Sequence, residues 1–306
     1  MAQISAIFPC SIGYTTFGTP APHFHGSLSF SKPSLSFKAT SIRPSFSIKS
    51  FIHPLSVQTG RRRTSAAATC SHGEQFSGVM TSSTELEPSL SVKNKAVEVV
   101  HELKGTSIFL VGMNSTMKTN LGKLLSEVLR YYYFDSDSLV EQAAGGESAA
   151  KLFREKDEEG FRESETEVLK QLSSMGRLVV CAGDGAVQSS TNLALLRYGI
   201  SLWIDVPLDI LAKEAVQNGG RCPSTWGLAP SDSFPEVLAK LTKLYEEMRG
   251  GYATADATVS LQKIASQLEY DDMEAVTPED MAMEVLREIE KLTRVKKMME
   301  EAAKPF

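Results

Sequence analysis

Residues 106–119 read TSIFLVGMNSTMKT, and this stretch decides the fold class of the chain. Its first six residues form a short apolar run that is typical of a buried strand. The next eight match the phosphate-loop frame G-x-x-x-x-G-K-[ST] at Gly112, Lys118 and Thr119. Met117 stands where the frame requires glycine. Because such a loop wraps phosphates with backbone N–H groups, we expect the methionine side chain to obstruct the close approach that glycine permits.

Short apolar runs alternate with helical patterns along the rest of this region. Strands are predicted at 106–111, 131–134, 178–181 and 201–204. Helices are predicted at 92–103, 118–129, 138–144, 158–174, 191–197, 208–217 and 236–248, and a last one starts at Thr277. This alternation indicates an α/β fold, with a parallel sheet covered by helices on both faces. Ligands bind beyond the carboxyl ends of such strands, so the polar residues that follow them should share one rim.

The composition excludes several classes of protein. The 306 residues carry a formal charge of −5 and are 42% hydrophobic, enough for one sizeable globular domain with extensions. No apolar run approaches the roughly 20 residues of a transmembrane helix. The four cysteines form no C-x-x-C pair, so neither a zinc site nor a disulfide framework is expected. Cys181 ends an apolar run and is predicted to lie in the core rather than to act as a nucleophile.

The first 73 residues are rich in serine, threonine and proline and contain seven basic residues but no acidic one. This composition predicts a plastid transit peptide at 1–73; the alternative is a disordered tail without an address. The remainder holds 25 basic and 37 acidic residues, a formal charge of −12. That surplus argues against nucleic acid as a partner. The other predicted boundaries are a linker at 74–91, the compact domain at 92–270 and a C-terminal helical extension at 271–306.

Seven sequence blocks between residues 92 and 264 resemble the plant shikimate kinase family, most closely its chloroplast shikimate-kinase-like branch. They read, in order, FLVGMNSTMKT, NLGKLLSEVL, YYYFDSDSLVEQAAGG, GFRESETEVL, LVVCAGDGAV, LWIDVPLDILAKE and LYEEMRGGYATADATVSL. The resemblance implies a phosphate-loop fold of the nucleoside-monophosphate-kinase type, with a lid. The glycine-, proline- and serine-rich stretch 218–235 is where that lid is expected.

On the nucleotide side, the resemblance implies that Gly112 and Lys118 bind the phosphates. Thr119 would hold magnesium, and Asp135 would help to organise that ion through water. The lid of the family contributes an arginine before a proline. Here Arg221 is separated from the proline by one inserted residue, which makes it an uncertain match.

On the substrate side, the resemblance implies that Asp137 binds the hydroxyl groups of shikimate. Arg162 would pair with the shikimate carboxylate, supported by Glu165. Gly183 and Gly185 are the outer residues of a Gly-Gly-Gly turn after the third strand. Taken singly, these features are ordinary helix caps, turns and surface ion pairs; their order along the chain is what makes them one site.

Four positions depart from the family pattern. Ser115 and Met117 replace two glycines of the phosphate loop, and we expect strain at Met117 if the loop needs left-handed geometry there. Asp184 replaces the middle glycine of the turn and brings negative charge to an anion site. Met248 occupies the place of a second arginine for the substrate carboxylate. Arg249 lies one residue later, about 100° around a helix, and should point elsewhere.

Three hypotheses follow. The first is a plastid pseudoenzyme that keeps the fold without shikimate kinase activity; the resemblance implies a role in chloroplast biogenesis. The second is a working ATP-dependent kinase acting on shikimate or on a changed substrate, and the third is a module that senses a ligand without turnover. No cofactor is expected under the first hypothesis, whereas ATP and Mg²⁺ are expected under the second. The sequence names no partner, and plastid proteins are the class considered.

Overall fold

A computed structural model describes residues 88–304, apart from 218–225, 227 and 230. The described residues all belong to the same compact unit. The transit peptide predicted at 1–73, most of the predicted linker and Arg221 lie outside them and stay predictions. Within the part of the chain that is described, no helix is long and apolar enough to cross a membrane.

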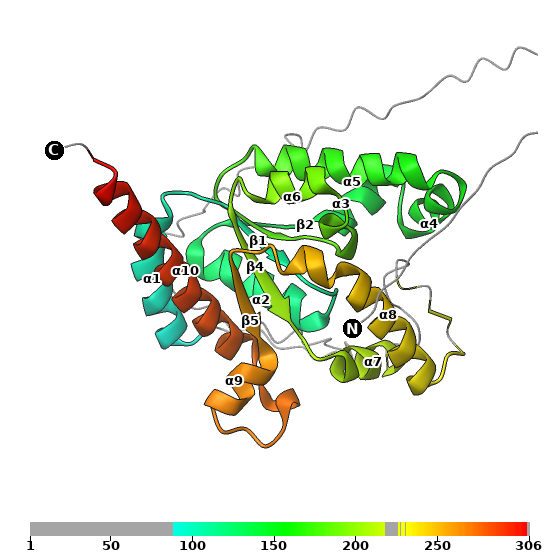
Figure 1. The fold of residues 1–306 in the computed structure, drawn as a ribbon. Helices are drawn as coiled ribbons and strands as arrows, with labels where there is room; N and C mark the ends of the chain where they lie inside the picture. The colour runs from blue at the N-terminus through cyan, green and yellow to red at the C-terminus, as the bar shows by residue number, and fades with distance from the viewer. Residues whose placement is uncertain (1–87, 218–225, 227, 230, 305–306) are drawn as a thin grey trace, which may run out of the picture. The chain divides into compact units, whose positions relative to one another are not determined.

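Five parallel strands form one sheet in the order β2-β3-β1-β4-β5 (Figure 1). They are β1 (Ile108–Val111), β2 (Tyr132–Asp135), β3 (Leu178–Cys181), β4 (Ile200–Asp205) and β5 (Ala257–Ser260). The central strand β1 pairs with β3 and β4 in register, so that Phe109 lies opposite both Val180 and Ser201. The predicted parallel sheet is confirmed. The edge strand β5 was missed because its four residues contain one fully buried apolar side chain, Val259.

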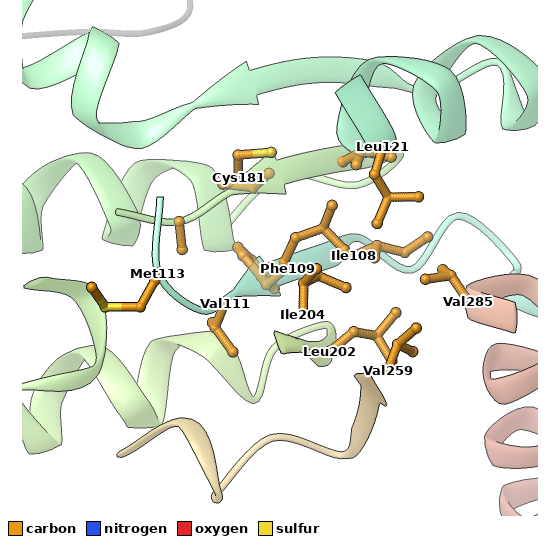
Figure 2. Close-up of a cluster of buried hydrophobic side chains, with 14 of the residues drawn as sticks. Ile108, Phe109, Val111, Met113, Leu121, Cys181, Leu202, Ile204, Val259 and Val285 are labelled. Atoms are coloured by element: carbon orange, nitrogen blue, oxygen red, sulfur yellow. The ribbon is translucent and has the colours of Figure 1, made fainter. Parts of the chain in front are cut away.

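Helices cover both faces of the sheet, as every residue of β1 and β3 is buried. Figure 2 shows the core around β1: Ile108 and Phe109 lie among side chains from β3, β4 and β5 and from two helices. Cys181, predicted as a core residue, is 1% exposed. This apolar packing holds the carboxyl ends of the strands at one rim, where the polar loops begin.

Most helices agree with the sequence pattern to within about two residues. They are α1 (Leu90–Leu103), α2 (Thr116–Leu129), α3 (Ser136–Ala144), α4 (Glu147–Lys156), α5 (Glu158–Ser173), α6 (Ser190–Leu196), α7 (Leu208–Gln217), α8 (Phe234–Tyr252), α9 (Leu261–Gln267) and α10 (Pro278–Ala302). The patterns did not predict α4 or α9. In α4 only Ala150 is buried, so the helix has almost no apolar stripe to recognise.

The last helix, α10, begins where the sequence predicts. The Thr277 hydroxyl accepts a hydrogen bond from the backbone N–H of Asp280, whose carboxylate in turn accepts one from the Thr277 N–H. The first half of α10 packs on β5, α2 and α1, and Lys95 on α1 pairs with Glu290 at 2.6 Å. In Figure 1 the two helices lie side by side, and the end of α10 extends beyond α1.

Candidate functional site

The phosphate loop connects β1 to α2. Gly112 has φ 128°, and a Cβ at this position would collide with the backbone carbonyl of Ile204, so only glycine fits. Ser115 caps α2: its hydroxyl accepts a hydrogen bond from the backbone N–H of Lys118 at 3.0 Å. Ser115 therefore stabilises the start of the helix, which begins at Thr116 rather than at Lys118 as predicted.

The strain considered at Met117 does not arise. Met117 is the second residue of α2, and its backbone is not among those with positive φ in the described residues. Its half-buried side chain packs against the hydrophobic core. What distinguishes Met117 from glycine is therefore side-chain volume and not backbone conformation.

Lys118 is 1% exposed, and its ammonium group is bound by the backbone of the site itself. The Nζ donates to the carbonyl of Gly112 at 2.7 Å and to the carbonyl of Ala182 at 2.9 Å. These contacts join the phosphate loop to the end of β3. In the state described, Lys118 acts as a cross-link between two loops.

Asp184 has no exposed surface, and each of its carboxylate oxygens accepts a hydrogen bond. The backbone N–H of Asn114, in the phosphate loop, donates to Oδ1 at 2.7 Å. The indole Nε1 of Trp226 donates to Oδ2 at 2.6 Å. The sequence predicts that the carboxylate of Asp184 repels a phosphate. In the structure, this carboxylate also occupies the backbone N–H group of Asn114 in the phosphate loop. No sequence motif signalled the parts played by Asn114 and Trp226.

A second carboxylate lies at the N-terminus of α2. Glu214, on α7, accepts hydrogen bonds from both the backbone N–H of Thr116, at 2.8 Å, and the Thr116 hydroxyl. A negative group at this end of a helix is favoured by the unpaired N–H groups and by the helix dipole. Sequence reasoning missed Glu214, although it closes the block LWIDVPLDILAKE.

Asp137 lies on the substrate side, in the first turn of α3. It accepts a hydrogen bond from Nδ2 of Asn114 at 2.8 Å, and a Cβ on Gly183 would overlap its carboxylate. Burial, together with the charges of Asp184 and Asp135, raises the pKa of Asp137 to about 7, although the bond from Asn114 opposes the shift. The site thus holds two neighbouring carboxylates that resist being charged together.

Arg162 and Glu165, expected as a pair, are joined at 2.8 Å between Nη1 and Oε2. Glu165 is buried, whereas the Arg162 side chain is 34% exposed. Arg154 approaches the other oxygen of Glu165 at 3.9 Å and lies over the ring of Phe161. Burial lowers the pKa of Arg154. Sequence reasoning missed Arg154 because it lies on α4, the helix that had no recognisable stripe.

Two other expected residues have structural roles. Asp135 caps α3, where its Oδ1 accepts a hydrogen bond from the backbone N–H of Ser138 at 2.9 Å. Gly185 leaves room for Arg162, because a Cβ on residue 185 would collide with the Nη1 atom of that arginine. Among the residues described, no group of three His, Cys, Asp or Glu side chains is placed to hold a metal ion.

Met248 lies in an apolar setting, 3% exposed. The hydroxyl of Tyr252 donates to its sulfur at 3.2 Å and lies 3.7 Å from the sulfur of Met113. The Tyr252 ring stacks on Trp203 with centroids 5.9 Å apart. Arg249 is exposed and faces Glu246 at 4.0 Å, so it points away as predicted.

A family model for shikimate kinase matches residues 114–277, more than half of the chain. The chain belongs to the shikimate kinase family. Over 215 residues it is 63% identical to an Arabidopsis thaliana protein named probable inactive shikimate kinase like 1, chloroplastic; the match covers 70% of this chain and 73% of the relative. Over 205 residues it is 44% identical to shikimate kinase 2, chloroplastic, of Oryza sativa subsp. japonica, covering 67% of each.

A solved structure supports the fold of this shikimate kinase family member. Shikimate kinase from Acinetobacter baumannii in complex with shikimate superposes with a TM-score of 0.51 at 24% identity. The match covers 63% of this chain and 97% of that one. The predicted phosphate-loop, kinase-like architecture is confirmed.

The residues present do not fit the ATP and Mg²⁺ that the family resemblance implies for an active member. The N–H groups of Asn114 and Thr116 are bonded to the carboxylates of Asp184 and Glu214. The ammonium of Lys118 is bonded to two carbonyls. A triphosphate would have to displace two negative groups from the positions where it needs positive ones.

Proposed function

We propose that this member of the shikimate kinase family is a pseudoenzyme that does not phosphorylate shikimate. The observation that carries the proposal is the fully buried carboxylate of Asp184, which bonds to the phosphate loop and lies beside Asp137. Phosphoryl transfer depends on positive or N–H groups that stabilise negative charge in the transition state. A fixed carboxylate at that point opposes the reaction electrostatically.

The substrate side supports the same conclusion. Where the family pattern has a second arginine for the carboxylate, Met248 is buried against Tyr252. Arg162 retains its pairing with Glu165, so half of the predicted carboxylate recognition is kept. Orientation of a substrate by one arginine in place of two lowers the fraction of reactive encounters.

The proposal includes a plastid location and a non-catalytic role in chloroplast biogenesis. The location is supported by the composition of residues 1–73 and by relatives that are named chloroplastic. The role in biogenesis is supported by the resemblance to the shikimate-kinase-like branch. Plastid proteins are the partners to look for.

The decisive assay compares the parent chain with a variant that restores the family residues. The variant carries Ser115→Gly, Met117→Gly, Asp184→Gly and Met248→Arg, and both proteins are given MgATP and shikimate. We expect no shikimate 3-phosphate from the parent and measurable product from the variant. Parent turnover comparable to that of an active plant shikimate kinase would refute the proposal.

A matched control guards against a contaminating kinase. Adding Lys118→Ala to the restored variant should abolish the gained activity, because the phosphates then lack their lysine. Product that persists in this control must come from another enzyme.

The non-catalytic role can be tested in a plant that lacks the chain. Asp137→Asn keeps the shape of the side chain but removes the carboxylate proposed to bind substrate. We expect the parent and Asp137→Asn genes to restore chloroplast development equally well. Rescue by the parent alone would show that the role needs the carboxylate chemistry.

A further inference from the structure

We propose that the phosphate loop of this chain is permanently self-occupied: the carboxylates of Asp184 and Glu214 take the places of a ligand's phosphate oxygens and exclude anions from outside. The inference rests on the proposed function and extends it, because it explains how the site is kept closed. Glu214, which is not one of the four departures from the family pattern, is the second residue that excludes anions from the loop.

Asp184 meets the geometric requirements of an internal ligand. Its two oxygens lie 2.7 Å from the backbone nitrogen of Asn114 and 2.6 Å from Nε1 of Trp226, short separations of the kind that a charged acceptor favours. The side chain is wholly buried, so water cannot compete for either donor. A carboxylate and a phosphate both present negatively charged acceptor oxygens, which backbone N–H groups at a helix N-terminus bind.

Glu214 supplies the second internal ligand from a different helix. It bonds to the N–H of Thr116 at 2.8 Å and also to the Thr116 hydroxyl. Thr116 is the first residue of α2, where N–H groups have no partner within the helix. Asp184 and Glu214 therefore satisfy donors at two points of the same loop-to-helix turn.

Lys118 completes the closed arrangement. Its ammonium is held by the carbonyls of Gly112 and Ala182, and the side chain is 1% exposed. An incoming anion would have to break these two bonds as well as displace two carboxylates. Electrostatic repulsion and the loss of hydrogen bonds act in the same direction.

The test uses inorganic pyrophosphate without metal as the probe and thermal unfolding of the full chain as the readout. The parent should show no change in Tm with 10 mM pyrophosphate. Asp184→Ala leaves the N–H groups of Asn114 and Trp226 without their acceptor, and we expect its Tm to fall by about 5–10 °C. Pyrophosphate should restore at least half of that loss, because an external anion can now enter.

Glu214→Gln removes charge but keeps an oxygen that can accept from Thr116. Alone, it should lower Tm by less than Asp184→Ala. Combined with Asp184→Ala, it should tighten pyrophosphate binding by about tenfold, since a repelling charge is gone. Glu163→Gln is the matched control: it makes the same charge change at an exposed position on α5 and should produce no response to pyrophosphate.

Either of two results with pyrophosphate would overturn the inference: a rise in the parent's Tm, or a folded Asp184→Ala variant that pyrophosphate fails to stabilise. If Asp184→Ala does not fold, Asp184→Asn is judged by the same two criteria. A parent that binds pyrophosphate but makes no shikimate 3-phosphate would refute self-occupation and leave the proposed function intact. A parent that makes the product would refute both.

Discussion

The phosphate-loop half of the site and its substrate half depart from the family pattern in different ways: the first gains a negative charge, and the second loses a positive charge. In the phosphate half, Asp184 adds negative charge where glycine is expected, and Glu214 lies against the same turn. In the substrate half, Met248 replaces a positive charge, and its surroundings have become apolar core. The first half is filled by hydrogen-bonded carboxylates, whereas in the second the place of the expected arginine is filled by apolar packing around Met248.

This difference shows that one site can be closed by two kinds of interaction, with different consequences for stability. A buried carboxylate is costly to keep unless its oxygens are bonded, so the phosphate half depends on a few specific donors. The packed half depends on volume and contact area, which many residues share. Variants in the two halves should therefore respond differently to anions and to pH.

The largest effect is expected in the packed half. Tyr252→Ala removes a ring that is fully buried and stacked on Trp203, and it should lower the free energy of unfolding by about 3–5 kcal/mol. Urea unfolding measures the change. Tyr198→Ala, which truncates a tyrosine that is 73% exposed, is the matched control and should change stability little. Equal losses in the two variants would contradict the view that Tyr252 belongs to the core.

The phosphate half gives the next largest effect. Lys118→Met removes the donor shared by the carbonyls of Gly112 and Ala182, and we expect a loss of about 2 kcal/mol in unfolding free energy. Chemical denaturation of the variant and the parent provides the comparison, with exposed Lys123→Met as the control. An unchanged midpoint for Lys118→Met would show that the lysine does not cross-link the loops.

A pH-dependent effect distinguishes the neighbouring carboxylates of the site from the apolar packing around Met248. The folded-state pKa of Asp137, about 7, lies above its ordinary value of 3.8, so the folded state holds the proton more tightly. Its contribution to stability is therefore full below about pH 4 and is lost as pH rises through 7. Asp137→Asn lacks this titration and should gain roughly 1–2 kcal/mol relative to the parent between pH 5 and pH 6.5.

The measurement is urea unfolding of both proteins at several pH values in that range. A difference between Asp137→Asn and the parent that stays constant with pH would rule out the raised pKa. Tyr252→Ala should not reproduce the pattern, because its loss comes from packing.

The smallest effect is expected at Arg249. Its side chain is 62% exposed and faces Glu246 at 4.0 Å, the geometry of a weak surface pair. Arg249→Ala should change unfolding free energy by less than about 0.5 kcal/mol. It should also leave the response of Tm to shikimate unchanged. A shikimate response that depends on Arg249 would mean that this arginine replaces the one absent at position 248.

The sequence alone determined where four of the five described strands lie along the chain, to within about two residues, and where most of the described helices lie. The pattern at 106–119 placed the phosphate loop, and the apolar run at 178–181 gave the bounds of β3. These features depend on interactions between near neighbours, which local apolar spacing records. The elements missed, α4, α9 and β5, are short, polar or at the sheet edge, so their apolar signal is weak.

Only the tertiary structure decided which groups satisfy the phosphate loop. The bonds from Asn114 to Asp184, from Trp226 to Asp184 and from Thr116 to Glu214 join residues that are 70, 42 and 98 positions apart. No local pattern encodes such pairings, because they form when packing of the sheet and helices brings the loops to one rim. The sequence showed that Asp184 is an unusual residue for this family, and the fold showed what its carboxylate binds.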